Sequence, residues 1–328
     1  MSPNPRHPSY NLEPIQSLAS LAAALGLSEA DLLDLAPRAP NLYREGTRPK
    51  TGGGVRTYYD ALEPLKTVHG RILRQILDRV AWPRYLFGGI RDPVCPRDYV
   101  RNATFHAGAA LQFTTDIKNF FPSIQAPAVQ RIWQGVFHFA PPVAEMLTVL
   151  TTYRGFLPQG TRTAQALANL VLWDIEPQTV DWLEDLGFRY SRLTDDITIS
   201  TLDSRHAARL PAAIQIIHEM LRARGFRRNG RKERVTTQRG SMIVNNVVTN
   251  RRVALPRGSR DDIAREAIAL AKRLHDSEPG AEAALPHVVG CLHTLRRFHP
   301  READRLGKLL WRVLPEPVAA SAGLRRWA

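Results

Sequence analysis

The chain has 328 residues, of which 44% are hydrophobic, enough to bury the core of one multi-lobed unit rather than several free domains. Two cysteines, Cys95 and Cys291, are too few and too far apart for a disulfide framework or a zinc cluster, which fits a reducing cytosol. The 45 Lys and Arg residues against 31 acidic ones give a net charge of +14, which suits a polyanionic partner, although a generally basic surface gives the same count. No apolar stretch approaches the roughly 20 residues of a membrane span, and the N-terminus lacks the apolar core of a signal peptide.

The first predicted elements are two short helices. The alanine- and leucine-rich stretch from Ile15 to Leu25 reads as a helix that Gly26 ends. Ser28 then offers an N-cap for a second helix, from Asp31 to Leu35, which we expect to stop before Pro37. A helical pair of this kind is usually structural.

A basic, glycine-rich segment follows at residues 48–59 and predicts a β-hairpin with a flexible tip. A solvated turn accounts for the charge of Lys50. The guanidinium of Arg56 has the forked geometry that suits phosphate oxygens. From Leu65 to Val80 the apolar residues recur with helical spacing, which predicts an amphipathic helix that packs one face on the core.

Three carboxylates stand out further along the chain. The β-rich stretch that starts at Leu111 ends in Asp116, and the hairpin predicted from Tyr190 to Ser200 has Asp195 and Asp196 at its tip. A pair of aspartates in a turn is often only solvated. With a further acid on an adjacent strand, however, the carboxylates can bind Mg²⁺, a cation that prefers oxygen ligands.

The rest of the chain from Gln159 onward is predicted to form mainly helices, with one extended region among them. Gln159 heads a helix with Thr163 as its cap, a second helix runs from Leu210 to Arg224, and a cationic run around Lys232 would by itself be a solvated face. The C-terminal part is expected to be helical, and its arginines suit a duplex backbone. The expected ranges are a strand pair or one extended strand at 242–250 and helices at 259–275, 285–298 and 302–314.

The order of three motifs resembles the palm of a reverse transcriptase. These motifs are D-I-K-N-F-F-P-S-I from Asp116, L-P-Q-G from Leu157, and the hairpin with two aspartates. The segment N-A-T-F-H from Asn102 to His106 is similar to a motif of retron reverse transcriptases. Two motifs depart from the family: Y-x-D-D reads L-T-D-D at 193–196, and V-T-G reads V-N-N at 244–246. The chain is therefore identified as a divergent retron-type enzyme or a relative among bacterial defence reverse transcriptases.

The resemblance implies an α+β fold of the right-hand polymerase type. A helical leader would occupy residues 1–44, fingers and a palm with an antiparallel sheet residues 45–250, and a helical thumb residues 251–328. The first arginine pair after the palm and Pro256 suggest this last boundary.

The resemblance also implies roles for individual residues. In the palm, the three aspartates would hold two Mg²⁺ ions, and a lysine would protonate the leaving pyrophosphate. Other residues would clamp the triphosphate, exclude a ribose 2′-hydroxyl or approach the base pair, and a further group would bind RNA. The catalytic residues would be Asp116, Asp195, Asp196 and Lys232, and the metal ligands Asp116, Ile117, Asp195 and Asp196. The nucleotide-binding residues would be Arg56, Ile117, Phe121, Gln159 and Gly160, with Phe121 as the sugar gate. The RNA-binding residues would be Asn102, His106, Arg296 and Arg297.

The function that the resemblance implies is RNA-directed DNA synthesis in the cytoplasm. A dedicated structured non-coding RNA would serve as template and supply the priming 2′-hydroxyl, so that the single-stranded DNA product (msDNA) stays joined to RNA. dNTPs would be the substrates, and an effector protein would serve antiphage defence. Two alternatives stay open: a group-II-intron-like or other defence reverse transcriptase with different priming, and a catalytically weak RNA-binding scaffold in which Leu193 replaces the motif tyrosine.

Overall fold

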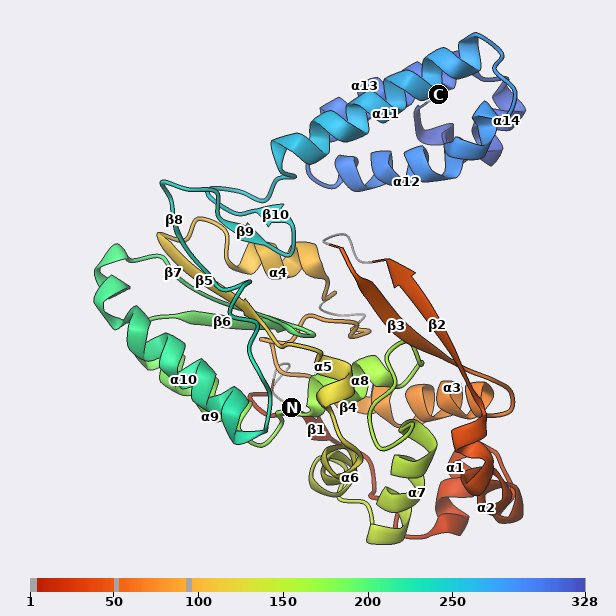
Figure 1. The fold of residues 1–328 in the computed structure, drawn as a ribbon, viewed down its shortest axis with the longest axis vertical. Helices are drawn as coiled ribbons and strands as arrows, with labels where there is room; N and C mark the ends of the chain where they lie inside the picture. The colour runs from red at the N-terminus through yellow and green to blue at the C-terminus, as the bar shows by residue number, and fades with distance from the viewer. Residues whose placement is uncertain (1–4, 50–52, 93–95, 328) are drawn as a thin grey trace. The chain divides into compact units, whose positions relative to one another are not determined.

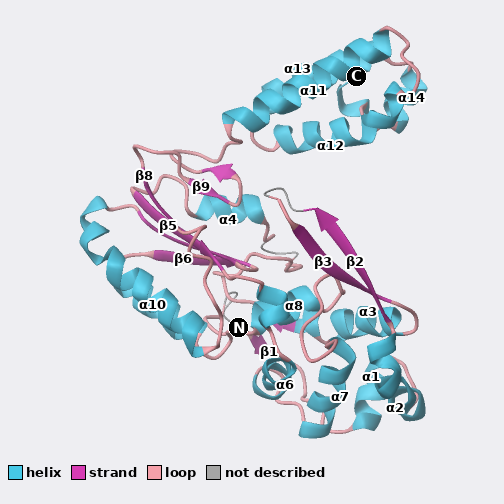
Figure 2. Ribbon diagram, viewed as in Figure 1, coloured by secondary structure: helices cyan, strands magenta, loops and turns pink. Residues whose placement is uncertain are grey.

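The computed structural model describes residues 5–49, 53–92 and 96–327, so Lys50 and Cys95 lie outside the described residues. Two compact units make up the chain: residues 1–102 with 109–237, and residues 103–108 with 238–328. Helices and antiparallel strands alternate along the sequence, which confirms the predicted α+β class (Figure 1, Figure 2).

The N-terminal helices of the first unit form where the capping residues predict them. Helix α1 (Leu18–Leu25) follows Ser17, whose side chain accepts a hydrogen bond from Ser20 N, and it ends at the left-handed Gly26. Helix α2 (Glu29–Arg38) begins with a capping box between Ser28 and Asp31. The predicted stop before Pro37 is wrong, because this proline lies in the last turn, where its missing N–H removes only one helical hydrogen bond.

Strands β2 (Tyr43–Pro49) and β3 (Val55–Ala61) form the predicted hairpin. Helix α3 (Leu65–Gln75) ends earlier than predicted. A 3₁₀ turn at Leu77–Arg79 and the short strand β4 (Val80–Ala81) follow it. Strand β4 pairs with β1 (Ser9–Tyr10). Val80, which the apolar spacing placed at the end of the helix, therefore lies in a strand that pairs with a segment near the N-terminus.

A four-stranded antiparallel sheet with the order β6-β7-β5-β8 lies at the centre of the first unit. Its strands are β5 (Leu111–Asp116), β6 (Arg189–Leu193), β7 (Asp196–Thr201) and β8 (Arg234–Thr237). Strand β5 lies between β7 and β8 and is almost completely buried. The sheet therefore provides a rigid support for the residues at the end of β5.

Further helices and a 3₁₀ turn belong to the first unit, and all of them except the first helix and the turn contribute residues to one hydrophobic core. They are α4 (Tyr99–Phe105), which continues into the second unit, α5 (Phe120–Ser123), α6 (Ala126–Gly135), α7 (Pro141–Thr151), α8 (Ala164–Leu170), α9 (Glu176–Asp185), the 3₁₀ turn Ser204–Arg209 and α10 (Leu210–Ala223). Gly225 adopts a positive φ after α10, as expected for a helix end. Thr163 occupies the N-cap position of α8, but its side chain makes no capping hydrogen bond, so that part of the prediction is wrong.

The second unit is mainly helical and has its own core. It contains the hairpin β9 (Ile243–Val244) and β10 (Val247–Val248), the helices α11 (Arg257–His275), α12 (Leu285–Arg296), α13 (Pro300–Val313) and α14 (Glu316–Ser321), and 3₁₀ turns at Ala281–Ala284 and Arg325–Trp327. Asn245 and Asn246 both adopt left-handed backbone conformations in the hairpin turn, which asparagine tolerates better than most residues. The boundary predicted between residues 250 and 251 falls inside this unit.

The C-terminal end of the chain contributes to this core. Trp327 is 1% exposed, and its indole N–H donates to the Asp304 carboxylate at 3.0 Å. A Cβ on Gly307 would come within 2.4 Å of the Trp327 ring, so glycine is needed for this contact. None of the described helices combines the length and apolar character needed to cross a membrane.

Candidate active site

The predicted acids come together at one end of the central sheet. Asp116 is the last residue of β5 and pairs in register with Asp196, the first residue of β7. Asp195 lies in the turn before it, and its carbonyl accepts a hydrogen bond from the Ile117 N–H at 3.0 Å. The structure thus places two acids of one hairpin beside an acid that lies almost 80 residues earlier in the sequence.

A buried ion pair supports the turn that carries Asp195. The Arg192 side chain is fully buried, and its Nε and Nη2 lie 2.6 and 2.7 Å from the two carboxylate oxygens of Glu176. The same guanidinium donates to the carbonyls of Thr194 at 3.0 Å and Asn169 at 2.8 Å. Burying two charges is costly, and here the buried guanidinium also makes direct hydrogen bonds to the backbone of the turn.

A second contact fixes the turn from the side. Thr194 has a φ of +61°, and its hydroxyl accepts a hydrogen bond from Gln165 Nε2 at 2.6 Å. Gly88 and Gly89 pack against this pair so closely that a Cβ at Gly88 would lie 2.4 Å from Thr194 Oγ1. The turn of the divergent L-T-D-D motif is therefore held by its second residue.

The electrostatics of the acids require a compensating cation. Asp116 is 5% exposed, and its Oδ1 is buried without a hydrogen-bond partner. Its Oδ2 accepts a hydrogen bond from Lys232 Nζ at 2.6 Å, which raises the pKa of Lys232. Burial raises the pKa of Asp195, and repulsion from Asp116 adds to this shift.

The donor set fits a divalent metal with a preference for oxygen. Asp116, Asp195 and Asp196 offer hard carboxylate oxygens, and the unpartnered Asp116 Oδ1 lacks the positive partner that a metal would supply. Within residues 5–49, 53–92 and 96–327, three ligand atoms of His, Cys, Asp or Glu come within 4.8 Å of one another only at Glu266, His287 and Cys291. The three aspartates therefore do not all converge on a single point.

Four of the five predicted nucleotide-binding residues line one cavity of about 320 Å³ beside the acids. Its walls include Arg56, Phe121, Gln159, Gly160 and Asp195. The cavity forms because the Gln159 carbonyl accepts a hydrogen bond from the Tyr59 N–H at 2.7 Å, which brings strand β3 against the L-P-Q-G segment.

Gly160 permits this approach. Its φ is +111°, and a Cβ there would lie 2.9 Å from the Tyr59 carbonyl oxygen. Ile117, the fifth predicted residue, is buried at the sheet end, where its backbone contacts the Asp195 turn.

The predicted RNA-binding residues are not among those that line this cavity. The side chains of Asn102 and His106 are fully buried. They could therefore affect RNA binding only indirectly, by stabilising the conformation of the segment that contains them. Arg296 donates to Asp304 at 3.1 Å, whereas Arg297 is exposed. Their assignment as RNA-binding residues stays a prediction.

Four residues that support the turn were not predicted from the sequence: Arg192, Glu176, Thr194 and Gln165. Only Arg192 could have been found from the sequence pattern. Arg192 is a charged residue in the middle of a predicted strand, two positions before the turn, where burial would require a partner. Its partner, Glu176, could not be identified from the spacing alone.

The first unit thus has an antiparallel sheet with three carboxylates at one end, next to a cavity lined by Arg56 and the close-packed Gly160. No family model matches the chain. The chain is 32% identical to the retron Se72 reverse transcriptase of Salmonella heidelberg over 216 residues, 65% of this chain and 56% of that protein. The retron Ec48 reverse transcriptase of Escherichia coli is 31% identical over 59% of this chain and 49% of its own length, and the retron Ec86 enzyme of the same species is 26% identical over 91% and 89%.

In sequence the chain is therefore similar to several retron reverse transcriptases, which confirms the resemblance of its motifs. The chain spans about half the length of the first two of these relatives. Among solved structures, the telomerase of Candida albicans in complex with a telomeric RNA fragment aligns with a TM-score of 0.48 and 12% identity, over 86% of this chain and 56% of that chain.

Proposed function

We propose that the chain is a retron-type RNA-directed DNA polymerase, with residues 45–250 as fingers and palm and the C-terminal helices as thumb. The observation that carries this proposal is the cavity that Arg56, Phe121, Gln159 and Gly160 share with Asp195. Residues that contact a nucleotide must lie next to the groups that promote its transfer, and these residues come from separate parts of the sequence.

In this proposal Asp116, Asp195 and Asp196, with the backbone at Ile117, hold two Mg²⁺ ions. When bound, such ions lower the pKa of the primer hydroxyl and neutralise the charge on the triphosphate. The buried Asp116 and the ion-paired support under the turn keep the carboxylates in place before substrate arrives.

The other cavity residues bind and select the nucleotide. The fork of Arg56 donates to phosphate oxygens, and the ring of Phe121 excludes a ribose 2′-hydroxyl. Gln159 and Gly160 lie against the nascent base pair. Lys232 transfers a proton to the leaving pyrophosphate; its side chain is 64% exposed, so it can move from Asp116 to the phosphate.

The proposed partners follow from the same assignment. A structured non-coding RNA serves as template and primer, dNTPs are the substrates, and the DNA product remains linked to the RNA. The net charge of +14 supports binding to such a polyanion. The complex would act in the cytoplasm, with an effector protein, in defence against phage.

The test is dNTP incorporation on an RNA template by the wild type, by Asp195→Ala and by the matched control Asp185→Ala, an exposed acid at the end of α9. We expect the wild type and the control to extend the primer with Mg²⁺, and Asp195→Ala to lose about a hundredfold or more in rate. Equal extension by the wild type and Asp195→Ala would overturn the proposed site. Sequencing the nucleic acid that copurifies with the protein then tests the retron assignment, which predicts one structured RNA with a branched guanosine.

A further inference from the structure

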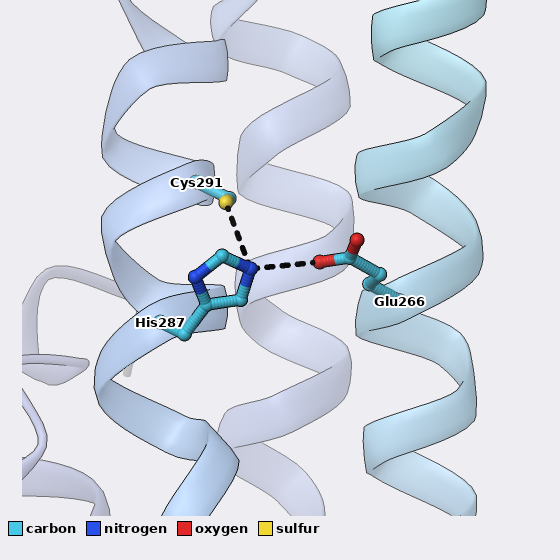
Figure 3. Close-up of side chains that lie close together, drawn as sticks. All are labelled: Glu266, His287 and Cys291. Carbon is cyan, nitrogen blue, oxygen red and sulfur yellow. Dashed lines mark hydrogen bonds and ion pairs between the residues drawn. The ribbon is translucent and has the colours of Figure 1, made fainter. Parts of the chain in front are cut away.

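Three side chains on two helices of the second unit point toward one place on its surface (Figure 3). Glu266 belongs to α11, and His287 and Cys291 lie one turn apart on α12. His287 Nε2 lies 3.2 Å from Glu266 Oε2 and 3.8 Å from Cys291 Sγ. All three ligand atoms lie within 4.8 Å of one another.

The two separations that involve His287 agree with tetrahedral coordination. Zinc binds nitrogen and oxygen at about 2.0–2.2 Å and sulfur at about 2.3 Å, so in a tetrahedron the nitrogen and oxygen lie about 3.4 Å apart and the nitrogen and sulfur about 3.6 Å apart. The corresponding distances of 3.2 and 3.8 Å each differ from these values by about 0.2 Å. His287 therefore already lies at about the spacing from Glu266 and from Cys291 that a bound ion requires.

The types of ligand select the kind of metal. One imidazole nitrogen, one thiolate and one carboxylate suit zinc and similar transition metals, whereas Mg²⁺ prefers oxygen ligands alone. The His287 and Glu266 side chains are 70% and 50% exposed, so an ion can enter from solution and keep a water as its fourth ligand. A surface pair of His287 and Glu266 alone would contribute little to stability, and it would not explain why the thiol faces the same point.

We propose that Glu266, His287 and Cys291 form a three-ligand site for a zinc-class divalent ion, with water in the fourth position. Binding forms a metal–sulfur bond and releases the thiol proton to solvent, with no change in oxidation state. Burial, with Glu266 adding to it, raises the pKa of the Cys291 thiol, so the proton is present until the ion displaces it. The bound ion links α11 to α12 and stabilises the second unit, independently of the proposed polymerase function.

The experiment uses the full chain without an affinity tag, with Co²⁺ as the probe and millimolar Mg²⁺ present to occupy oxygen-only sites. We expect about one equivalent of Co²⁺ to produce a thiolate-to-cobalt charge-transfer absorption that Zn²⁺ then abolishes. Cys291→Ser should lose this absorption completely, and His287→Gln should weaken Co²⁺ binding at least tenfold. The control His275→Gln, which removes a histidine outside the cluster, should retain it, and Cys95→Ser tests whether the other cysteine of the sequence contributes.

Zn²⁺ should also raise the thermal midpoint of the wild type but not of Cys291→Ser, and it should slow the reaction of the Cys291 thiol with a disulfide reagent. Circular dichroism of the metal-free variants checks that they fold. Absence of the charge-transfer band in the wild type would overturn the proposal, and so would a band that persists in Cys291→Ser. Because primer extension is measured separately, its loss or survival does not decide this site.

Discussion

At the scale of single residues, the positions of Asp195 and Asp196 depend on Arg192, which holds the turn that carries them. Its guanidinium is shared between the buried Glu176 carboxylate and the carbonyl of the half-buried Thr194. Arg192 is a positioning residue, because it contacts the turn through the backbone and not through the reacting groups.

We predict that Arg192→Met destabilises the first unit by about 3–5 kcal/mol, because Glu176 is left as an uncompensated buried charge. Urea unfolding measures this loss. The double variant Arg192→Met/Glu176→Gln should recover part of it, since the second change removes the buried charge. A loss below about 1 kcal/mol in the single variant would show that the ion pair does not support the turn.

A second prediction concerns Phe121, which lines the cavity beside Asp195. If its ring excludes the ribose 2′-hydroxyl, Phe121→Ala should raise incorporation of ribonucleotides relative to deoxynucleotides on the order of tenfold or more. Steady-state incorporation of both nucleotide classes measures the ratio, with Phe105→Ala, an exposed ring outside the cavity, as the control. An unchanged ratio would rule out the gate.

The acids and the cavity residues could be predicted because each belongs to a short motif with distinct chemistry. The supports of the turn could not, because Arg192, Gln165 and Glu176 acquire their roles only through contacts across 16 to 29 positions of sequence. Likewise, the burial of Asn102 and His106 depends on packing that a five-residue motif does not contain.

At the scale of elements, helix α3 is held to α7 by a buried histidine. His69 Nε2 lies 2.7 Å from the Leu150 carbonyl oxygen, so the neutral ring donates its proton there. Burial lowers the pKa of His69 to about 4, from an ordinary value near 6.5. The folded protein therefore keeps this ring neutral at pH values at which the unfolded chain protonates it.

Acidification therefore destabilises the folded protein through His69. Between pH 6.5 and 4 the unfolded state binds the extra proton, so acidification lowers the free energy of unfolding by up to about 3 kcal/mol, and the effect levels off below pH 4. Urea unfolding between pH 7.5 and 4 should show this loss in the wild type, and a smaller one in His69→Gln, whose amide can still donate to Leu150. If both proteins have the same pH dependence, His69 is not the group responsible.

The ends of elements were predicted well where a cap is local. Ser28 with Asp31 and the glycines after α1 and α10 fix those ends through neighbouring residues. The predicted end of α3 was wrong because the residues after it include β4, which pairs with β1, about 70 residues away in sequence. The prediction that the Thr163 side chain caps α8 was wrong, because its hydroxyl is buried without a hydrogen-bond partner.

At the scale of the whole molecule, two units with separate cores carry the two proposed sites, the polymerase palm in the first and the metal cluster in the second. The sequence suggested a division near residue 250, where arginines and a proline interrupt the pattern. The observed division at residue 237, with residues 103–108 joining the second unit, follows from packing between distant segments. The role of Trp327 in the second core was likewise invisible in a short charged tail.

The most direct test of the central claim is single-turnover dNTP incorporation on an RNA template by Asp116→Asn, because this acid comes from a different strand from the Asp195–Asp196 turn. The account predicts that primer extension falls by about a hundredfold or more, while the variant stays folded and still binds RNA. Extension at the rate of the wild type would show that Asp116 takes no part in the reaction and would contradict the proposed active site.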